Sequence, residues 1–132
     1  MYLFRAAPAA WLTLLFAALG AVVTIYVATE VIEEVRGPRH MLTLLSVVVA
    51  EFVIFFTFQY WYLSLISPTS FPTLPLDPAG LLLHSTMVFV FNPLYLPANF
   101  IGRALLLINT ASALGLVLFI LQNIWQFRRN NI

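Results

Sequence analysis

Glu51 is a polar side chain inside a long apolar stretch, where a carboxyl group could do chemistry. It comes ten residues after Met41, in a stretch that ends near Ile66. A carboxyl group at that depth in a bilayer could relay a proton or a cation, or it could join helices through hydrogen bonds. Candidate partners for such bonds are Thr13, Thr24, Thr110 and Ser112. The sequence leaves both interpretations of Glu51 open.

His84 is a second isolated polar side chain in apolar surroundings. A neutral imidazole could be the axial ligand of a haem or of a chlorophyll-type pigment. It could also be a hydrogen-bonded structural residue, because no second histidine lies at a helix-pairing distance and His40 lies far along the chain. We therefore expect no cofactor and keep a haem or chlorophyll-type pigment at His84 as the alternative.

Asn109, Thr110 and Ser112 cluster near Gly115 in the last apolar stretch. These polar side chains could line a pore. The small residues beside them are more typical of helix packing with interhelical hydrogen bonds, which is the interpretation that we prefer. Gly20, which lies among alanines, indicates another surface of close helix contact. No spacing of serine, histidine and acidic residues supports a nucleophile or a metal site, so we do not expect an enzyme.

The composition indicates the class of protein in which these side chains lie. Of the 132 residues, 62% are hydrophobic and only 8% are charged, whereas about 25% of the residues of a soluble domain are charged. So little charge cannot solvate a globular surface, and the sequence predicts an all-α integral membrane protein in contact with the lipid bilayer. The net charge of +1 gives no reason to expect nucleic acid as a partner, and the absence of cysteine excludes disulfides.

Three apolar stretches are long enough to cross a bilayer, which takes about 20 residues. They are residues 7–28, 41–66 and 100–127. A fourth stretch, residues 79–91, is too short to cross and is predicted to be a re-entrant helix that enters and leaves the membrane on one side. Asp77 and Pro78 precede it as a predicted N-cap and first-turn proline.

The first apolar stretch is longer than the roughly 7–15 residues of a signal-peptide core, so we interpret it as a retained transmembrane helix. Residues 29–40 then form a polar connection in which Gly37 and Pro38 stop the helix. The chain is thereby divided into an N-terminal helix with its connection, residues 1–40, and a hairpin that holds the re-entrant helix, residues 41–132.

Arginines set the predicted orientation. Arg36 and Arg39 lie in the first connection, and Arg128 and Arg129 follow the last apolar stretch. Three spans and one re-entrant helix place these two regions on the same side, which the positive-inside rule makes cytoplasmic. The N-terminus then lies outside and the C-terminus in the cytoplasm, and we expect a prokaryotic plasma membrane.

Aromatic residues fit this orientation. Tryptophan and tyrosine are enriched where a transmembrane helix passes the membrane–water interface. Trp11 and the aromatic segment 58–62 would lie at the outer interface, and Trp125 would lie at the inner one. The sequence therefore predicts an aromatic belt at each end of the helices.

Residues 41–132 carry an ordered set of features. An outer helix (41–66) has an aromatic end. A short helix (79–91) follows an acidic residue, an inner helix (100–127) opens with Gly102-Arg103, and Gly115 lies farther along it. This order resembles the two-helix pore domain of the potassium-channel superfamily. The resemblance implies a pore-domain fold with a re-entrant helix and a hinge at Gly115. It also implies that the relatives of this chain are tetramers.

The sequence departs from that family at the selectivity filter. The family aims backbone carbonyls at the ion, and the glycines of Thr-Val-Gly-Tyr-Gly allow the necessary backbone angles. Proline fixes its own φ and restricts the residue before it. We therefore predict that the pore-loop-like segment forms no potassium-selective filter, because it has no glycine and no acidic residue. The segment consists of Val90, Phe91, Asn92, Pro93, Leu94, Tyr95 and Leu96.

These observations lead us to expect a non-catalytic accessory or structural subunit of a larger membrane complex, respiratory or photosynthetic, built on a channel-like scaffold. A hetero-complex is the favoured assembly. One alternative is a homotetrameric, poorly selective cation channel in which Glu51 tunes conduction. Another alternative is a small pigment- or haem-binding membrane subunit that uses His84.

Overall fold

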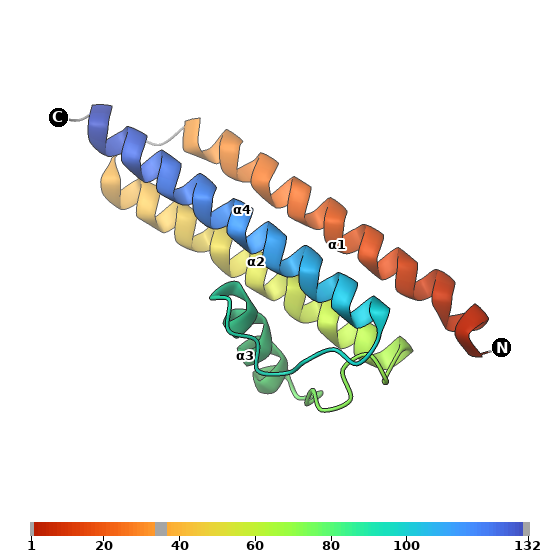
Figure 1. Ribbon diagram of the computed structural model, residues 1–132. Helices are drawn as coiled ribbons and strands as arrows, with labels where there is room; N and C mark the ends of the chain where they lie inside the picture. Colours follow the sequence, from red (N-terminus) through yellow and green to blue (C-terminus); the bar gives the residue numbers. More distant parts are fainter. Residues whose placement is uncertain (1, 34–36, 131–132) are drawn as a thin grey trace.

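The computed structural model describes residues 2–33 and 37–130. In this part of the chain the regular secondary structure consists of α-helices, and there is no strand. The helices are α1 (Tyr2–Glu33), α2 (Pro38–Ile66), α3 (Pro78–Phe89) and α4 (Phe100–Asn130). The three long helices lie side by side, and the short α3 lies against one flank of the bundle (Figure 1). The all-α fold predicted from the sequence is confirmed.

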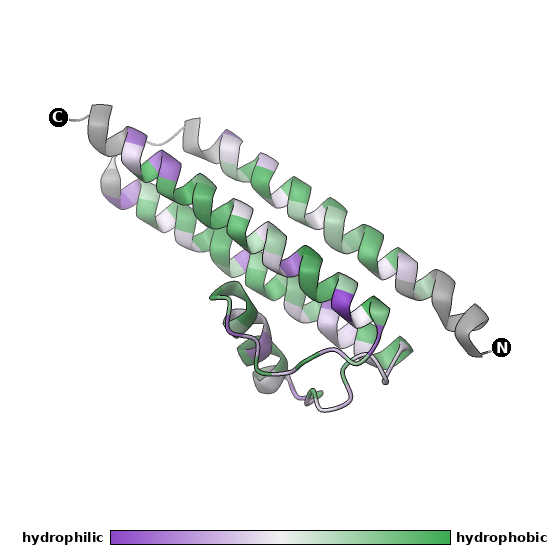
Figure 2. Ribbon diagram, in the orientation of Figure 1, coloured by the Kyte–Doolittle hydropathy of each residue, from purple (hydrophilic) through white to green (hydrophobic). Residues whose placement is uncertain are grey.

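Three segments are long and apolar enough to cross a membrane: Trp11–Glu30, Arg39–Ile66 and Phe100–Gln126. α3 has 12 residues, about 18 Å of helix at 1.5 Å per residue, which is too short for a hydrocarbon core of about 30 Å. Figure 2 shows that apolar residues dominate the middle of the long helices. The protein is therefore an integral membrane protein with three transmembrane helices and one short apolar helix, as predicted.

The helix boundaries follow local signals in the sequence. Gly37 is extended, with φ −167°, and Pro38 takes the first position of α2, where its missing N–H leaves no bond unmade. Asp77 caps α3, because its Oδ2 accepts a hydrogen bond from Gly80 N at 2.9 Å. Both boundaries agree with the sequence prediction. Arg36, on which the predicted orientation partly depends, lies outside the described residues.

α3 belongs to an excursion that leaves and rejoins the bundle at one end. Ala98 N donates to Ser70 O at 2.8 Å, which ties the segment after α3 to the segment before it. Gly102, in the first turn of α4, lies so close that a Cβ atom there would be 2.9 Å from Ser70 O. The end of α2 and the start of α4 therefore meet, and the excursion is re-entrant, as predicted for residues 79–91.

α3 runs from that end toward the middle of α2. Ser85 Oγ donates to Val53 O at 2.8 Å, and the ring centroids of Phe89 and Phe52 are 5.8 Å apart. Phe52 is the fifteenth of the 29 residues of α2, so the C-terminal end of α3 reaches the level of the α2 midpoint. Residues 90–99 then return to the start of α4 (Figure 1).

α1 packs against both α2 and α4. At Gly20 the ring of Phe55 occupies the space that a Cβ atom would need, which confirms the predicted close contact at this glycine. The predicted units 1–40 and 41–132 therefore share one core. Its buried members include Leu14, Ala17, Ala28, Phe52, Phe56, Leu105, Ala113 and Leu116.

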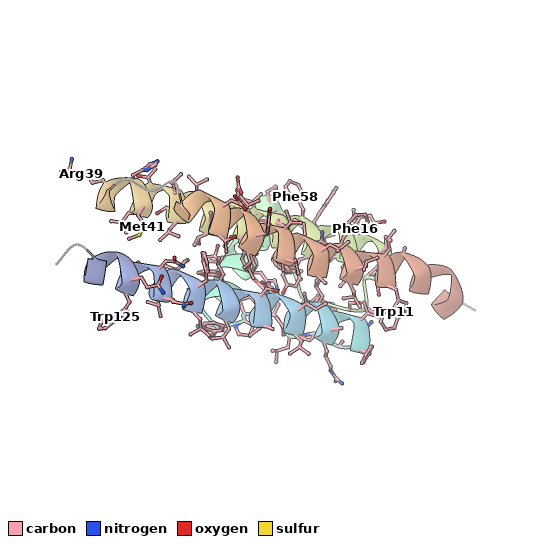
Figure 3. The ribbon with its side chains drawn as sticks, turned by 90° about the horizontal axis from the view of Figure 1, so that it is seen from above. Trp11, Phe16, Arg39, Met41, Phe58 and Trp125 are labelled. Atoms are coloured by element: carbon pink, nitrogen blue, oxygen red, sulfur yellow. The ribbon has the colours of Figure 1, made fainter. Side chains whose placement is uncertain are left out.

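Tryptophans lie near the two ends of the bundle. Figure 3 shows Trp11 toward one end, and Arg39 with Trp125 toward the other. The ring of Trp11 is 6.1 Å from that of Phe100, the first residue of α4. This distribution matches the aromatic belts that the sequence predicts for these tryptophans.

Single cysteines test this topology, because the chain has none of its own. Arg39, Thr69 and Gln126 are exposed. In sealed vesicles, Arg39→Cys and Gln126→Cys are expected to react with a membrane-impermeant maleimide from the same side, and Thr69→Cys from the opposite side. If Arg39→Cys and Gln126→Cys react from opposite sides, α3 crosses the whole bilayer and the re-entrant topology is wrong.

Candidate functional site

His84 and Tyr60 form the centre of a buried polar site at the contact between α2 and α3. Neither side chain is exposed, and their rings meet edge to face with centroids 4.4 Å apart. α3 brings His84 to this position on the face that also buries Leu81, Ser85 and Val88. The helix therefore places its one titratable side chain inside the fold.

Aromatic rings from both loops that flank α3 enclose His84 further. Phe71, before the helix, and Tyr95, after it, have ring centroids 5.6 and 5.7 Å from the imidazole. Neither ring nitrogen has a hydrogen-bond partner among the described residues. The charged form of the imidazole would lose its water in this enclosure, so burial favours the neutral form.

This enclosure bears on the haem or chlorophyll-type pigment expected as an alternative. A neutral imidazole has the chemistry of an axial ligand, but a macrocycle needs open space beside the ligating nitrogen. Tyr60, Phe71 and Tyr95 occupy that space. The residues around His84 do not fit such a group. Within residues 2–33 and 37–130, no group of three His, Cys, Asp or Glu could hold a metal ion either.

Tyr60 also joins α2 to α4. Asn109 Nδ2 donates to Tyr60 Oη at 2.9 Å, and both side chains are buried. This bond confirms the interhelical interpretation for Asn109, while Thr110 and Ser112 are half-buried beside it. The sequence places Tyr60 with the aromatic segment 58–62 at the outer interface, and that depth stays a prediction. Its side chain turns into the core, where its hydroxyl has a partner.

The pore-loop-like segment begins with the cap of α3. Asn92 N donates to Met87 O at 2.8 Å and Phe91 N to Val88 O at 2.9 Å, which is the Schellman arrangement that ends a helix. Phe91 makes the reversal with φ 62°. Glycine is usual at that position, because a Cβ atom is strained at such a φ. Since residues 90–96 contain no glycine, a phenylalanine takes the strained conformation.

The remainder of the segment is irregular and open to the surroundings. Val90, Leu94 and Leu96 are exposed, whereas Pro93 and Tyr95 are half-buried. Among the hydrogen bonds of the described residues, none uses a main-chain group of residues 93–96. This stretch of backbone is therefore without hydrogen-bond partners in the part of the chain that the structure describes.

The side chain of Glu51 lies on the outer surface of the helix bundle. It is exposed on α2, between exposed Val47 and exposed Ile54. The described residues give its carboxylate no hydrogen bond, and the hydroxyls of Thr13 and Thr24, two expected partners, donate to carbonyls of their own helix. The helix-joining interpretation therefore finds no partner for Glu51 among residues 2–33 and 37–130, and the relay interpretation stays a prediction.

Gly115 was predicted as a hinge or packing residue, and Phe71 was not predicted at all. Gly115 lies within the continuous helix α4, and a Cβ atom there would meet Ile25 at an ordinary 3.9 Å. A hinge at Gly115 stays a prediction. Phe71, which covers His84, was not predicted as a site residue, because no periodicity indicates burial in the loop 67–77.

No protein family, curated protein or solved structure matches the chain. The resemblance to the potassium-channel pore domain therefore depends on the order of its sequence features alone. A shared scaffold does not fix a function, so the function has to be argued from the residues of this chain.

Glycine and alanine at position 91 separate backbone strain from lost contacts. Phe91→Gly and Phe91→Ala remove the same ring, but only glycine relieves the positive φ. We expect Phe91→Gly to be more stable than Phe91→Ala by about 1 kcal/mol, measured by reversible unfolding with SDS in lipid–detergent bicelles. Equal free energies of unfolding would contradict the strained cap.

A double-mutant cycle measures the hydrogen bond between Tyr60 and Asn109. The coupling energy between Tyr60→Phe and Asn109→Leu is expected to be about 0.6 kcal/mol and at most about 1.7 kcal/mol, the range for bonds between membrane helices. Gln122→Leu replaces an exposed polar residue of α4 and should add to Tyr60→Phe without coupling. Strict additivity of the first pair would show that the bond does not form.

Proposed function

We propose that this protein is a non-catalytic subunit of a larger membrane complex, in which neighbouring subunits cover residues 90–98. The observation that supports the proposal is the position of this segment. It starts at the level of the α2 midpoint, where Phe89 packs on Phe52, and it returns to the end of the bundle without helical hydrogen bonds. Its side chains are exposed or half-buried along the whole path.

Lipid cannot solvate a backbone of this kind. An unpaired main-chain N–H or C=O group costs several kcal/mol in hydrocarbon, so irregular backbone at membrane depth occurs where protein or a water-filled cavity covers it. Leu94, Leu96 and the adjacent Phe100 are exposed apolar side chains. Apolar side chains beside the backbone favour protein over water as the covering material.

Other features agree with a packing role. His84, Tyr60 and Asn109 are at most 1% exposed, which closes these polar side chains off from any substrate. The scaffold resembles a channel pore domain without a filter. The host that we propose for it is a respiratory or photosynthetic complex of a prokaryotic plasma membrane. The arginines near both ends of the hairpin favour a cytoplasmic C-terminus and an outer N-terminus.

A homotetrameric, poorly selective cation channel is the second candidate. One observation favours it: α3 ends at the level of the α2 midpoint, and the C-terminal end of a helix carries a partial negative charge that attracts cations. Four copies could cover residues 90–98 of one another around a water-filled path. The carbonyls of Met87 and Val88 already accept cap hydrogen bonds, which weakens this field and makes the channel the less favoured candidate.

Reconstitution and native extraction test the proposal together. We expect the purified chain to conduct neither K⁺ nor Na⁺ in liposomes over a range of voltages and pH values. In mild detergent, the chain extracted from its own membrane should migrate with other subunits at a fixed ratio. Cation flux through the purified chain, or migration as a homotetramer alone, would overturn the proposal and favour the channel.

Two exposed leucines provide a matched comparison for the same extraction. Leu96 lies in the return segment and Leu118 on α4, and both are exposed. Leu96→Ala should lower the fraction of the chain that migrates with the complex about tenfold, a loss of roughly 1.4 kcal/mol in binding. Leu118→Ala should leave that fraction unchanged. Equal effects would mean that residues 90–98 are not the covered surface.

A further inference from the structure

One face of α2 is left uncovered by the other helices. Val47, Glu51, Ile54, Phe58 and Trp61 are all exposed there, and they follow one another at intervals of four and three residues. Positions with this period form the contact seam between two helices that cross at about 20°. We call these five residues the outer seam of α2. Figure 3 shows Phe58 on the side of the bundle away from α4.

Glu51 lies in the outer seam at the middle of the membrane-spanning helix α2. It is the fourteenth of the 29 residues of α2, so about 20 Å of helix separates it from either end at 1.5 Å per residue. A glutamate side chain is too short to reach water over that distance. A carboxyl group at the centre of a membrane helix costs a few kcal/mol, and a paired group removes much of that cost.

The described residues offer no cation at this level. The sequence has no lysine, and every arginine in the described helices lies in a first or last turn. His84 is wholly buried in its aromatic enclosure. Two copies that met along the outer seam, parallel or antiparallel, would bring Glu51 against Glu51. Charge complementarity therefore favours a different chain.

The surface beside the outer seam accepts a helix at close range. A groove of about 640 Å³ follows α2, and its lining includes Leu42, Ser46, Ala50, Ile54, Leu82 and Ile120. Ser46 and Ala50 are small side chains four residues apart, a spacing that lets two helix backbones approach. Ile54 belongs to both the groove and the outer seam, so the groove borders the outer seam at this residue.

We propose that the outer seam of α2 binds a transmembrane helix of another subunit, and that this helix carries an arginine or a lysine opposite Glu51. The inference rests on the proposed function, because it names the chemistry of one partner of the same subunit. The basic side chain pairs with the Glu51 carboxylate, and apolar side chains of the partner pack on Val47, Ile54 and Phe58.

A host–guest peptide provides the test. The full chain, labelled with a donor fluorophore through Gln126→Cys, is reconstituted with acceptor-labelled transmembrane peptides of leucine and alanine whose central residue is Arg, Gln or Leu. Energy transfer in vesicles should report an association constant at least tenfold higher for the Arg peptide than for the Leu peptide. Glu51→Leu should abolish the preference, and Glu51→Gln should reduce it. Gln122→Leu, the matched control on α4, should leave it unchanged.

Three results would overturn the inference. The Arg and Leu peptides could bind equally well, the Gln peptide could bind as tightly as the Arg peptide, or the chain could associate with itself through Glu51 more strongly than with any peptide. Circular dichroism of Glu51→Gln and Glu51→Leu shows whether each variant keeps its helices. These measurements do not involve residues 90–98 or cation flux. A failure of this inference can therefore be distinguished from a failure of the proposed function.

Discussion

The structure depends on one constraint, that hydrocarbon offers no hydrogen bonds to a polypeptide backbone. α1, α2 and α4 meet it internally, because a helix pairs its own main-chain groups along its length. α3 stops inside the membrane and meets the constraint with an Asp77 cap at one end and a Schellman cap at Phe91 at the other. Among the described residues, the main-chain groups of residues 93–96 find no hydrogen-bond partner, and this shortfall supports the proposed assembly with other subunits.

Two buried hydrogen bonds join the helices at the centre of the fold. Ser85 of α3 bonds to the Val53 carbonyl of α2, and Asn109 of α4 bonds to Tyr60 of α2, whose ring packs edge to face on His84. In a low-dielectric interior such bonds orient their helices strongly, because no solvent competes for the groups. The enclosed imidazole packs among these elements and is wholly buried.

Apolar length predicted the helices well. The stretches 41–66 and 100–127 correspond closely to α2 and α4. The stretch 79–91 has only 13 residues, and this length correctly predicted that α3 is too short to cross the membrane. Asp77 and Pro78 marked its start correctly, because capping is a local interaction between neighbouring residues. Length and local signals thus determine where these helices begin and end.

The rotation of each helix about its axis was not predictable. α2 is apolar on nearly every face, so periodicity does not indicate which side is buried. Tyr60 turns inward, where its hydroxyl accepts a hydrogen bond from Asn109, and Glu51 turns outward. Both facts depend on residues distant in sequence. The positive φ of Phe91 could not be predicted either, because phenylalanine is not a residue type that tolerates this conformation.

The tie between Ala98 and Ser70 has a consequence for biogenesis. The hydrogen bond from Ala98 to Ser70 closes the loop that carries α3, and Gly102 packs against the same carbonyl. Ser70 is synthesised before α3, and Ala98 and Gly102 are synthesised after it. The loop around α3 can therefore close only once the chain has been made as far as the start of α4.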